Sequence, residues 1–194
     1  MPLNLFIIGP SGCGKSTQAK LIAEKYNLTH LSMGQLLRDK IASDSPLGAK
    51  LKSYVDSGAW VPDDLIFEIL LLELNKLENQ NFIVDGFPRV LNQGKFIEHY
   101  LTKEREKPLS LIIHLDVTFE EIMARRNRLG QNFQDTNRTD NTPEAVAKRQ
   151  ASYDETIEPI KDYFSSVNKL FNVDGNRPVE PIFADICQKI DGLM

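Results

Sequence analysis

Five short apolar segments alternate with longer stretches of mixed polar and apolar residues along this chain. The short segments are rich in Ile, Val, Leu and Phe and lack strict alternation, which is typical of strands buried on both faces; they lie at 3–8, 28–32, 81–85, 110–117 and 169–174. The apolar spacing between them predicts helices at 15–26, 34–42, 46–57, 63–78, 91–104, 118–128, 143–166 and 179–191. Thr142 and Pro143 are typical of a helix start, and Pro159 is expected to kink or interrupt the helix that follows.

This alternation of strands and helices predicts an α/β fold with a doubly wound parallel sheet. Two segments interrupt the pattern, since residues 33–62 contain two predicted helices without a strand and residues 129–142 are polar without periodicity. Both are expected to be insertions over the carboxyl edge of the sheet, where ligands bind in such folds. The alternative for the second segment is an ordinary surface loop.

Composition limits the classes of protein and partner. The chain has 194 residues, 41% of them hydrophobic and 26% charged, which suits one α/β domain. A net charge of −4 gives no general attraction to nucleic acid or to acidic membranes, and no apolar run approaches the roughly 18 residues of a membrane span. Cys13 and Cys187 form no C-x-x-C pair, so we expect no disulfide framework, no structural zinc and a cytoplasmic setting.

The segment "GPSGCGKS", from Gly9 to Ser16, matches G-x-x-x-x-G-K-S/T between a predicted strand and a predicted helix. Its glycines allow successive backbone N–H groups to face anionic oxygens at the positive end of the helix dipole. Lys15 is expected to bridge the terminal phosphates, and the Ser16 hydroxyl to reach Mg²⁺. The motif predicts a bound nucleoside triphosphate but not the reaction, because GTPases, motors and kinases all use it.

A second segment, "NFIVDGFPR" at 81–89, has a carboxylate and a guanidinium group at the end of another predicted strand. Asp85 ends the apolar run, where its carboxylate could hold Mg²⁺ beside the glycine-rich loop. Arg89 is expected to project into the same crevice, at the place of a second phosphate. The alternative is a helix-capping aspartate and a surface arginine. The combination favours transfer between two phosphate-bearing ligands.

Several further segments together resemble the adenylate kinase family of P-loop nucleoside monophosphate kinases. They are "HLSMGQLLRD" (30–39), "SGAWVPDD" (57–64), "DGFPRVLNQGKF" (85–96), "NRTDNTPEAVAKR" (137–149) and "NVDGNRPVEPIF" (172–183). The resemblance implies a five-stranded core at 1–32, 63–128 and 143–194, a helical monophosphate-binding insertion at 33–62 and a short lid at 129–142. It also implies reversible transfer from ATP to AMP, giving two ADP, by a monomer that uses Mg²⁺ with ATP.

The resemblance implies a role for each residue of the site. The residues implied in catalysis are Lys15, Arg89, Arg125, Arg138 and Arg149. Those implied in ATP binding are Gly9, Ser11, Gly12, Cys13, Gly14, Lys15, Ser16, Thr17, Arg125 and Gly175. Those implied in AMP binding are Met33, Gly34, Arg38, Val61, Gly86, Arg89, Gln93, Arg138 and Arg149. Ser16 and Asp85 are the implied metal ligands, and Asp140 is implied to steady the lid arginines.

The chain departs from the family pattern at several positions, among them Val90, where threonine is common. Met33 replaces a threonine that usually contacts the acceptor base, and Gln35 replaces an aspartate. Leu129 stands where a second arginine usually begins the lid, so Arg126 or Arg128 is expected to substitute, with Arg128 favoured.

These departures leave alternatives open. Met33 motivates a UMP/CMP or broad-specificity kinase, whereas Gln93 favours AMP. A nucleotide-binding switch or scaffold that works through a protein partner is the alternative from another class. The three histidines, His30, His99 and His114, are expected to be structural.

Overall fold

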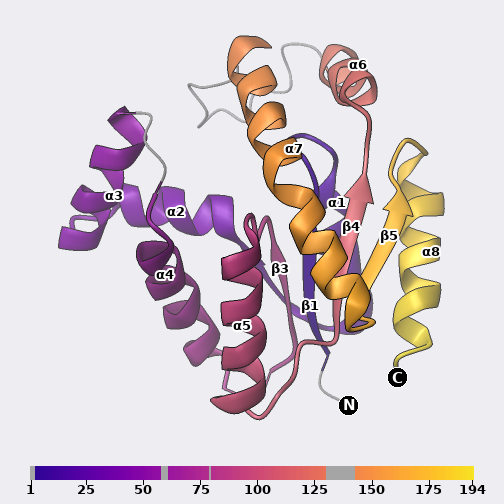
Figure 1. The fold of residues 1–194 in the computed structure, drawn as a ribbon, viewed down its shortest axis with the longest axis horizontal. Helices are drawn as coiled ribbons and strands as arrows, with labels where there is room; N and C mark the ends of the chain where they lie inside the picture. Colours follow the sequence, from indigo (N-terminus) through magenta and orange to yellow (C-terminus); the bar gives the residue numbers. More distant parts are fainter. Residues whose placement is uncertain (1–2, 58–60, 79, 130–142) are drawn as a thin grey trace.

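The computed structural model of the chain describes residues 3–57, 61–78, 80–129 and 143–194. These residues form a five-stranded parallel sheet in the order β2-β3-β1-β4-β5, with helices on both faces (Figure 1). The strands are β1 Asn4–Ile8, β2 Thr29–Ser32, β3 Phe82–Asp85, β4 Leu111–Asp116 and β5 Leu170–Asp174. The helices are α1 Lys15–Tyr26, α2 Met33–Ala42, α3 Pro46–Ser57, α4 Asp63–Lys76, α5 Leu91–Lys103, α6 Phe119–Leu129, α7 Pro143–Ser166 and α8 Val179–Asp191. The predicted fold class is confirmed.

Strand β1 explains why the apolar segments lack alternation. Leu5 and Ile7 belong to a hydrophobic cluster on one face of the sheet, to which α1 and α8 contribute Ile22 and Ile186. Phe6 and Ile8 belong to a second cluster on the other face, with side chains from α4, α5 and α7. Because helices cover both faces, every position of the strand is buried.

The order of the strands determines where a ligand can bind. β1 lies between β3 and β4, so the chain winds toward one edge of the sheet first and toward the other edge afterwards. Such a reversal opens a crevice at the carboxyl ends of the central strands. The glycine-rich segment that follows β1 and the "DGFPR" segment that follows β3 therefore share this edge.

The segment between β2 and α4 contains α2 and α3, which project to one side of the sheet (Figure 1). They pack against the first half of α4 through a small third cluster formed around Leu51, Leu65 and Ile69. The division into core, insertion and lid stays a prediction, and residues 130–142 lie outside the described part of the chain.

Helix α7 corrects one expectation about Pro159. The helix runs from Pro143 to Ser166 without interruption, so an interruption at Pro159 is wrong, whereas a kink there stays a prediction. Ile157, Ile160 and Phe164 on either side of the proline are buried against the sheet. We attribute the continuity to this packing, which offsets the loss of one backbone hydrogen bond.

Candidate functional site

The loop between β1 and α1 is built from residues 9–14 and requires glycine at specific places. Gly14 has φ 103°, in the left-handed region, directly before the first residue of α1. At Gly9 a Cβ atom would lie 2.8 Å from the carbonyl oxygen of Leu115 and 2.9 Å from Sγ of Cys13. The loop therefore passes too close to β4 for a side chain, and it ends at a helix N-terminus that attracts anions.

The ammonium group of Lys15 lies over this loop. Its Nζ donates to the carbonyl oxygen of Gly9 (2.9 Å) and to that of Pro10 (2.7 Å). Both bonds are within the segment, so the positive charge lies at the loop and does not extend into solvent. Ser11, Gly12 and Cys13 complete the loop, and Thr17 follows on the first turn of α1.

Ser16 and Asp85 link the loop to the end of β3. The Ser16 hydroxyl donates to Oδ2 of Asp85, whose residue is only 4% exposed. Nε2 of His30 lies 3.9 Å from the same carboxylate oxygen, and burial lowers the pKa of this imidazole. A hydroxyl and a buried carboxylate are the hard oxygen ligands that suit Mg²⁺, so these two residues fit the predicted metal.

Arg125 on α6 joins three parts of the edge. Its guanidinium donates to the carbonyl oxygen of Cys13 (2.7 Å) and to that of Gly175, beyond β5. Its Nε donates to Oε1 of Glu121 (2.8 Å). A Cβ atom at Gly175 would lie 2.4 Å from Cγ2 of Val117, so the 175 segment approaches as closely as a glycine allows.

Glu121 also binds Arg128, the residue expected to substitute for the arginine that is missing at position 129. Arg128 donates to Oε1 of Glu121 at 2.6 Å, the same oxygen that Arg125 contacts. The Arg125 hydrogen bond, with a further contribution from Arg128, holds the pKa of this carboxyl below its usual value. Sequence reasoning missed Glu121, although a glutamate four residues before an arginine on a helix is a recognisable pairing.

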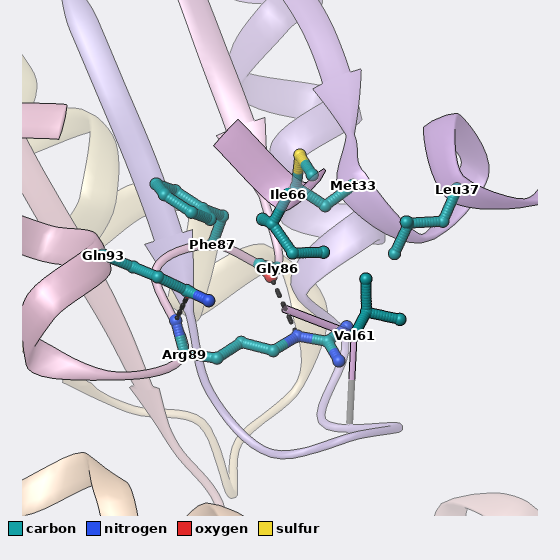
Figure 2. Close-up of a pocket in the computed structure, with 8 residues that line it drawn as sticks. All are labelled: Met33, Leu37, Val61, Ile66, Gly86, Phe87, Arg89 and Gln93. Atoms are coloured by element: carbon teal, nitrogen blue, oxygen red, sulfur yellow. Dashed lines mark hydrogen bonds between the residues drawn. The ribbon is translucent and has the colours of Figure 1, made fainter. Parts of the chain in front are cut away.

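A separate cavity of about 150 Å³ opens beside the end of β3 (Figure 2). Five predicted acceptor-site residues line it, together with three apolar residues that the sequence analysis did not assign. The lining residues are Met33, Leu37, Val61, Ile66, Gly86, Phe87, Arg89 and Gln93. Two of the missed residues, Leu37 and Ile66, occupy apolar positions of predicted helices, and Phe87 lies in the segment after β3; none of the three carries a separate signal.

Arg89 and Gln93 form the polar wall of this cavity. Nε of Arg89 donates to the carbonyl oxygen of Gly86 (3.3 Å), and its backbone N–H donates to Oε1 of Gln93 (2.8 Å), as Figure 2 shows. Nε2 of Gln93 in turn donates to Oδ1 of Asp63 at 2.7 Å. The cavity is thus apolar where Met33 and Ile66 lie and polar along α5.

Arg38 and Gly34 lie on α2, next to the cavity but outside its lining. A guanidinium nitrogen of Arg38 donates to Oε1 of Gln35 (2.7 Å), and Nε2 of Gln35 donates to Asp39 (2.7 Å). Gln35, which departs from the family pattern, is therefore a hydrogen-bond partner of the arginine predicted to hold the acceptor phosphate.

Four further residues were singled out in the sequence. Arg149 is on α7 and is half-buried. Arg138 and Asp140 lie outside the described residues. His114, on β4, is buried between Asn172 and Tyr153, with ring nitrogens 2.9 and 2.6 Å from their side-chain oxygens.

The described residues bear on a metal site and on membrane spans. Within residues 3–57, 61–78, 80–129 and 143–194, no group of three or more His, Cys, Asp or Glu side chains could hold a metal ion. In the same ranges, no helix is long and apolar enough to cross a membrane.

The chain was compared with known families and proteins. The sequence model of the family described as "Adenylate kinase" matches residues 7–169. A protein named adenylate kinase from Bacteroides fragilis is 36% identical over 192 residues, which is 98% of this chain and all of that protein. An adenylate kinase from Clostridium novyi is 33% identical, covering 98% of this chain and 99% of its own. Adenylate kinase 2 from Schistosoma mansoni is 33% identical, covering 95% of this chain and 87% of its own.

Proposed function

Because this chain belongs to the adenylate kinase family, we propose that it transfers the terminal phosphoryl group of ATP to AMP, reversibly, giving two ADP. The family and the enzyme class predicted from the sequence, a nucleoside monophosphate kinase, are confirmed by these comparisons. The assignment of individual residues is our proposal.

One observation supports this reaction above others: the end of β3 touches both candidate sites. Asp85 accepts a hydrogen bond from Ser16 of the glycine-rich loop. The residues that follow it, Gly86, Phe87 and Arg89, line the separate cavity. A donor held at the loop and an acceptor held in the cavity would therefore meet across one short segment, as a direct transfer requires.

In this proposal the catalytic power comes from position and charge. Lys15 at the loop and Arg89 at the cavity would stabilise the charge that develops on the transferring group, together with Arg125, Arg138 and Arg149. Arginine suits this task because its planar fork binds two phosphate oxygens at once. The transfer needs no general base from the chain. A lid at 129–142 would exclude water and so favour AMP over hydrolysis.

Ser16 and Asp85 would hold the Mg²⁺ that accompanies ATP. When bound, this ion would neutralise charge on the phosphate oxygens. Gly9, Ser11, Gly12, Cys13, Gly14 and Thr17 would bind the ATP phosphates through the loop. We further propose a cytoplasmic monomer, because two cysteines far apart in sequence fit a reducing setting and the resemblance to the family implies a monomer.

A coupled assay of ADP formation, with and without AMP, tests the reaction. We expect ATP consumption to depend on AMP and to fall by on the order of 10²-fold in Arg89→Ala. Lys103→Ala, which removes an exposed positive charge from the other end of α5, is the matched control and should keep the parent rate. A nucleotide-binding switch would instead hydrolyse ATP at a rate independent of AMP.

The apolar wall around Met33 is the observation that favours a second class of acceptor, CMP or UMP. A thioether cannot donate a hydrogen bond to a base, so this side of the cavity discriminates by shape alone. Initial rates with AMP, CMP and UMP at equal concentrations decide between the two. Comparable turnover of CMP or UMP would overturn the AMP assignment.

A further inference from the structure

We propose that Asp63 is a positioning residue that fixes the orientation of the Gln93 amide and thereby selects a 6-amino purine over a 6-oxo purine at the acceptor site. The inference rests on the proposed function and deepens it. It concerns a residue outside the cavity lining that acts on the base only through Gln93.

The orientation follows from what each partner of Gln93 is able to do. Gln93 is 2% exposed, so its amide depends on protein partners. The carboxylate of Asp63 accepts from Nε2 at 2.7 Å, and the backbone N–H of Arg89 donates to Oε1 at 2.8 Å. A flipped amide would turn its oxygen toward a carboxylate and its NH₂ group toward an N–H donor. Both contacts would be repulsive, so only one orientation is satisfied.

The same two bonds leave one donor and one acceptor on the amide. Nε2 carries two hydrogens and Oε1 two lone pairs, and the partners use one of each. Gln93 lines the cavity (Figure 2), and we infer that the remaining donor and acceptor face a base bound there. An adenine edge presents an acceptor at N1 and a donor at N6, whereas hypoxanthine presents a donor at N1–H and an acceptor at O6. The two bases therefore require opposite orientations of the amide.

A glutamine that rotated freely would pair with either base. The Arg89 N–H belongs to the backbone and only proline would remove it, at the cost of the arginine side chain, whereas the Asp63 carboxylate can be removed by itself. Asparagine at this position has the same shape and offers either an oxygen or an NH₂ group. Asp63→Asn therefore removes one of the two contacts that oppose the flipped amide, while the Arg89 N–H remains, and it keeps a residue of the same shape in the first turn of α4.

The neighbouring residue provides a matched control. Asp63 and Asp64 are both acidic residues in the first turn of α4, and each substitution by asparagine removes one negative charge from the same helix end. Asp64 is exposed, whereas Asp63 contacts Gln93. Any effect of charge or of helix stability should therefore appear in both variants, and an effect on base selection only in Asp63→Asn.

The experiment measures kcat/KM with AMP and with inosine monophosphate, at saturating ATP, for the parent, Asp63→Asn and Asp64→Asn, with a thermal melt of each. We expect the ratio of AMP to inosine monophosphate to fall about tenfold or more in Asp63→Asn, and to stay within twofold of the parent in Asp64→Asn. A loss that is equal for both acceptors would indicate a merely structural role and would overturn the inference. An unchanged ratio would overturn it as well. If the parent does not turn over AMP, both the proposed function and this inference are wrong, which distinguishes that outcome from an unchanged ratio.

Discussion

Replacing Gly94 by alanine tests how tightly the acceptor wall is packed. Gly94 follows Gln93 on α5, and a Cβ atom there would lie 2.8 Å from Cε2 and 3.1 Å from Cζ of Phe164 on α7. Phe164 is fully buried, so its ring has no solvent side toward which to move. The methyl group would therefore push α5 away from α7, and Gln93 with it.

Two opposing effects determine the magnitude. Alanine in place of glycine within a helix stabilises by about 1 kcal/mol. Overpacking of a buried contact costs about 1–3 kcal/mol, and a distance below 3 Å belongs in the upper part of that range. We expect a net loss of about 1–2 kcal/mol in the free energy of unfolding, which lowers Tm by roughly 2–8 °C for a chain of this size. The shift of Gln93 should raise KM for AMP several-fold and leave KM for ATP unchanged.

A double-mutant cycle with Phe164→Leu separates this contact from other effects. The leucine side chain is smaller and removes the clash, so Gly94→Ala should be less harmful in that background by about 0.5–1 kcal/mol or more. Urea unfolding gives the four free energies, and the ADP assay gives the two KM values. An increase in Tm for Gly94→Ala, or additive free energies, would refute the reasoning, because the helix contact would then have room for a methyl group.

Three further substitutions test other parts of the site. Lys15→Met should lower turnover on the order of 10²-fold without lowering Tm, and a loss of less than tenfold in the ADP assay would contradict its role at the loop. Gly175→Ala places a Cβ atom 2.4 Å from Val117, so urea unfolding should report a loss of about 1–3 kcal/mol. The same variant should raise KM for ATP, because the Gly175 carbonyl holds Arg125, and an unchanged KM would argue against that link. Burial lowers the pKa of His114 below its ordinary 6.5, so the unfolded chain binds more protons than the folded one just below pH 6.5. The free energy of unfolding should therefore fall as the pH drops through that window, by at most about 1.4 kcal/mol per pH unit. The fall should be less steep in His114→Gln. Equal slopes for the parent and the variant, measured by urea unfolding between about pH 7.5 and 5, would contradict this.

The strands and helices were predictable because burial on both faces leaves a local signature. Phe6 and Ile7 point to opposite clusters, so an uninterrupted apolar run was the expected pattern for β1. The glycine-rich loop was predictable for a similar reason, since Gly9 and Gly14 meet steric demands set within a few residues.

What could not be predicted depends on residues that meet only after folding. Asp63 and Gln93 are 30 positions apart, and Arg125 and Cys13 are 112 apart. No local pattern states which carboxylate will face an amide across two helices. An interruption at Pro159, one of the two effects expected there, was wrong for the same reason, because burial of the residues around the proline kept the helix continuous.

The packing of α8 has a consequence for synthesis of the chain. The cluster around Leu5 and Ile22 is completed by Ile182, Ile186 and Ile190, and Nε2 of Gln18 donates to the Val179 carbonyl oxygen across 161 positions. The first strand and helix leave the ribosome early, but the part of this cluster that α8 covers has no partner until the last helix emerges. Nascent chains that stop before α8 should therefore expose the side chains of α1 that α8 covers, and be ligands for chaperones. The glycine-rich loop at 9–14 joins a strand and a helix whose packing is complete only when the last helix has been made.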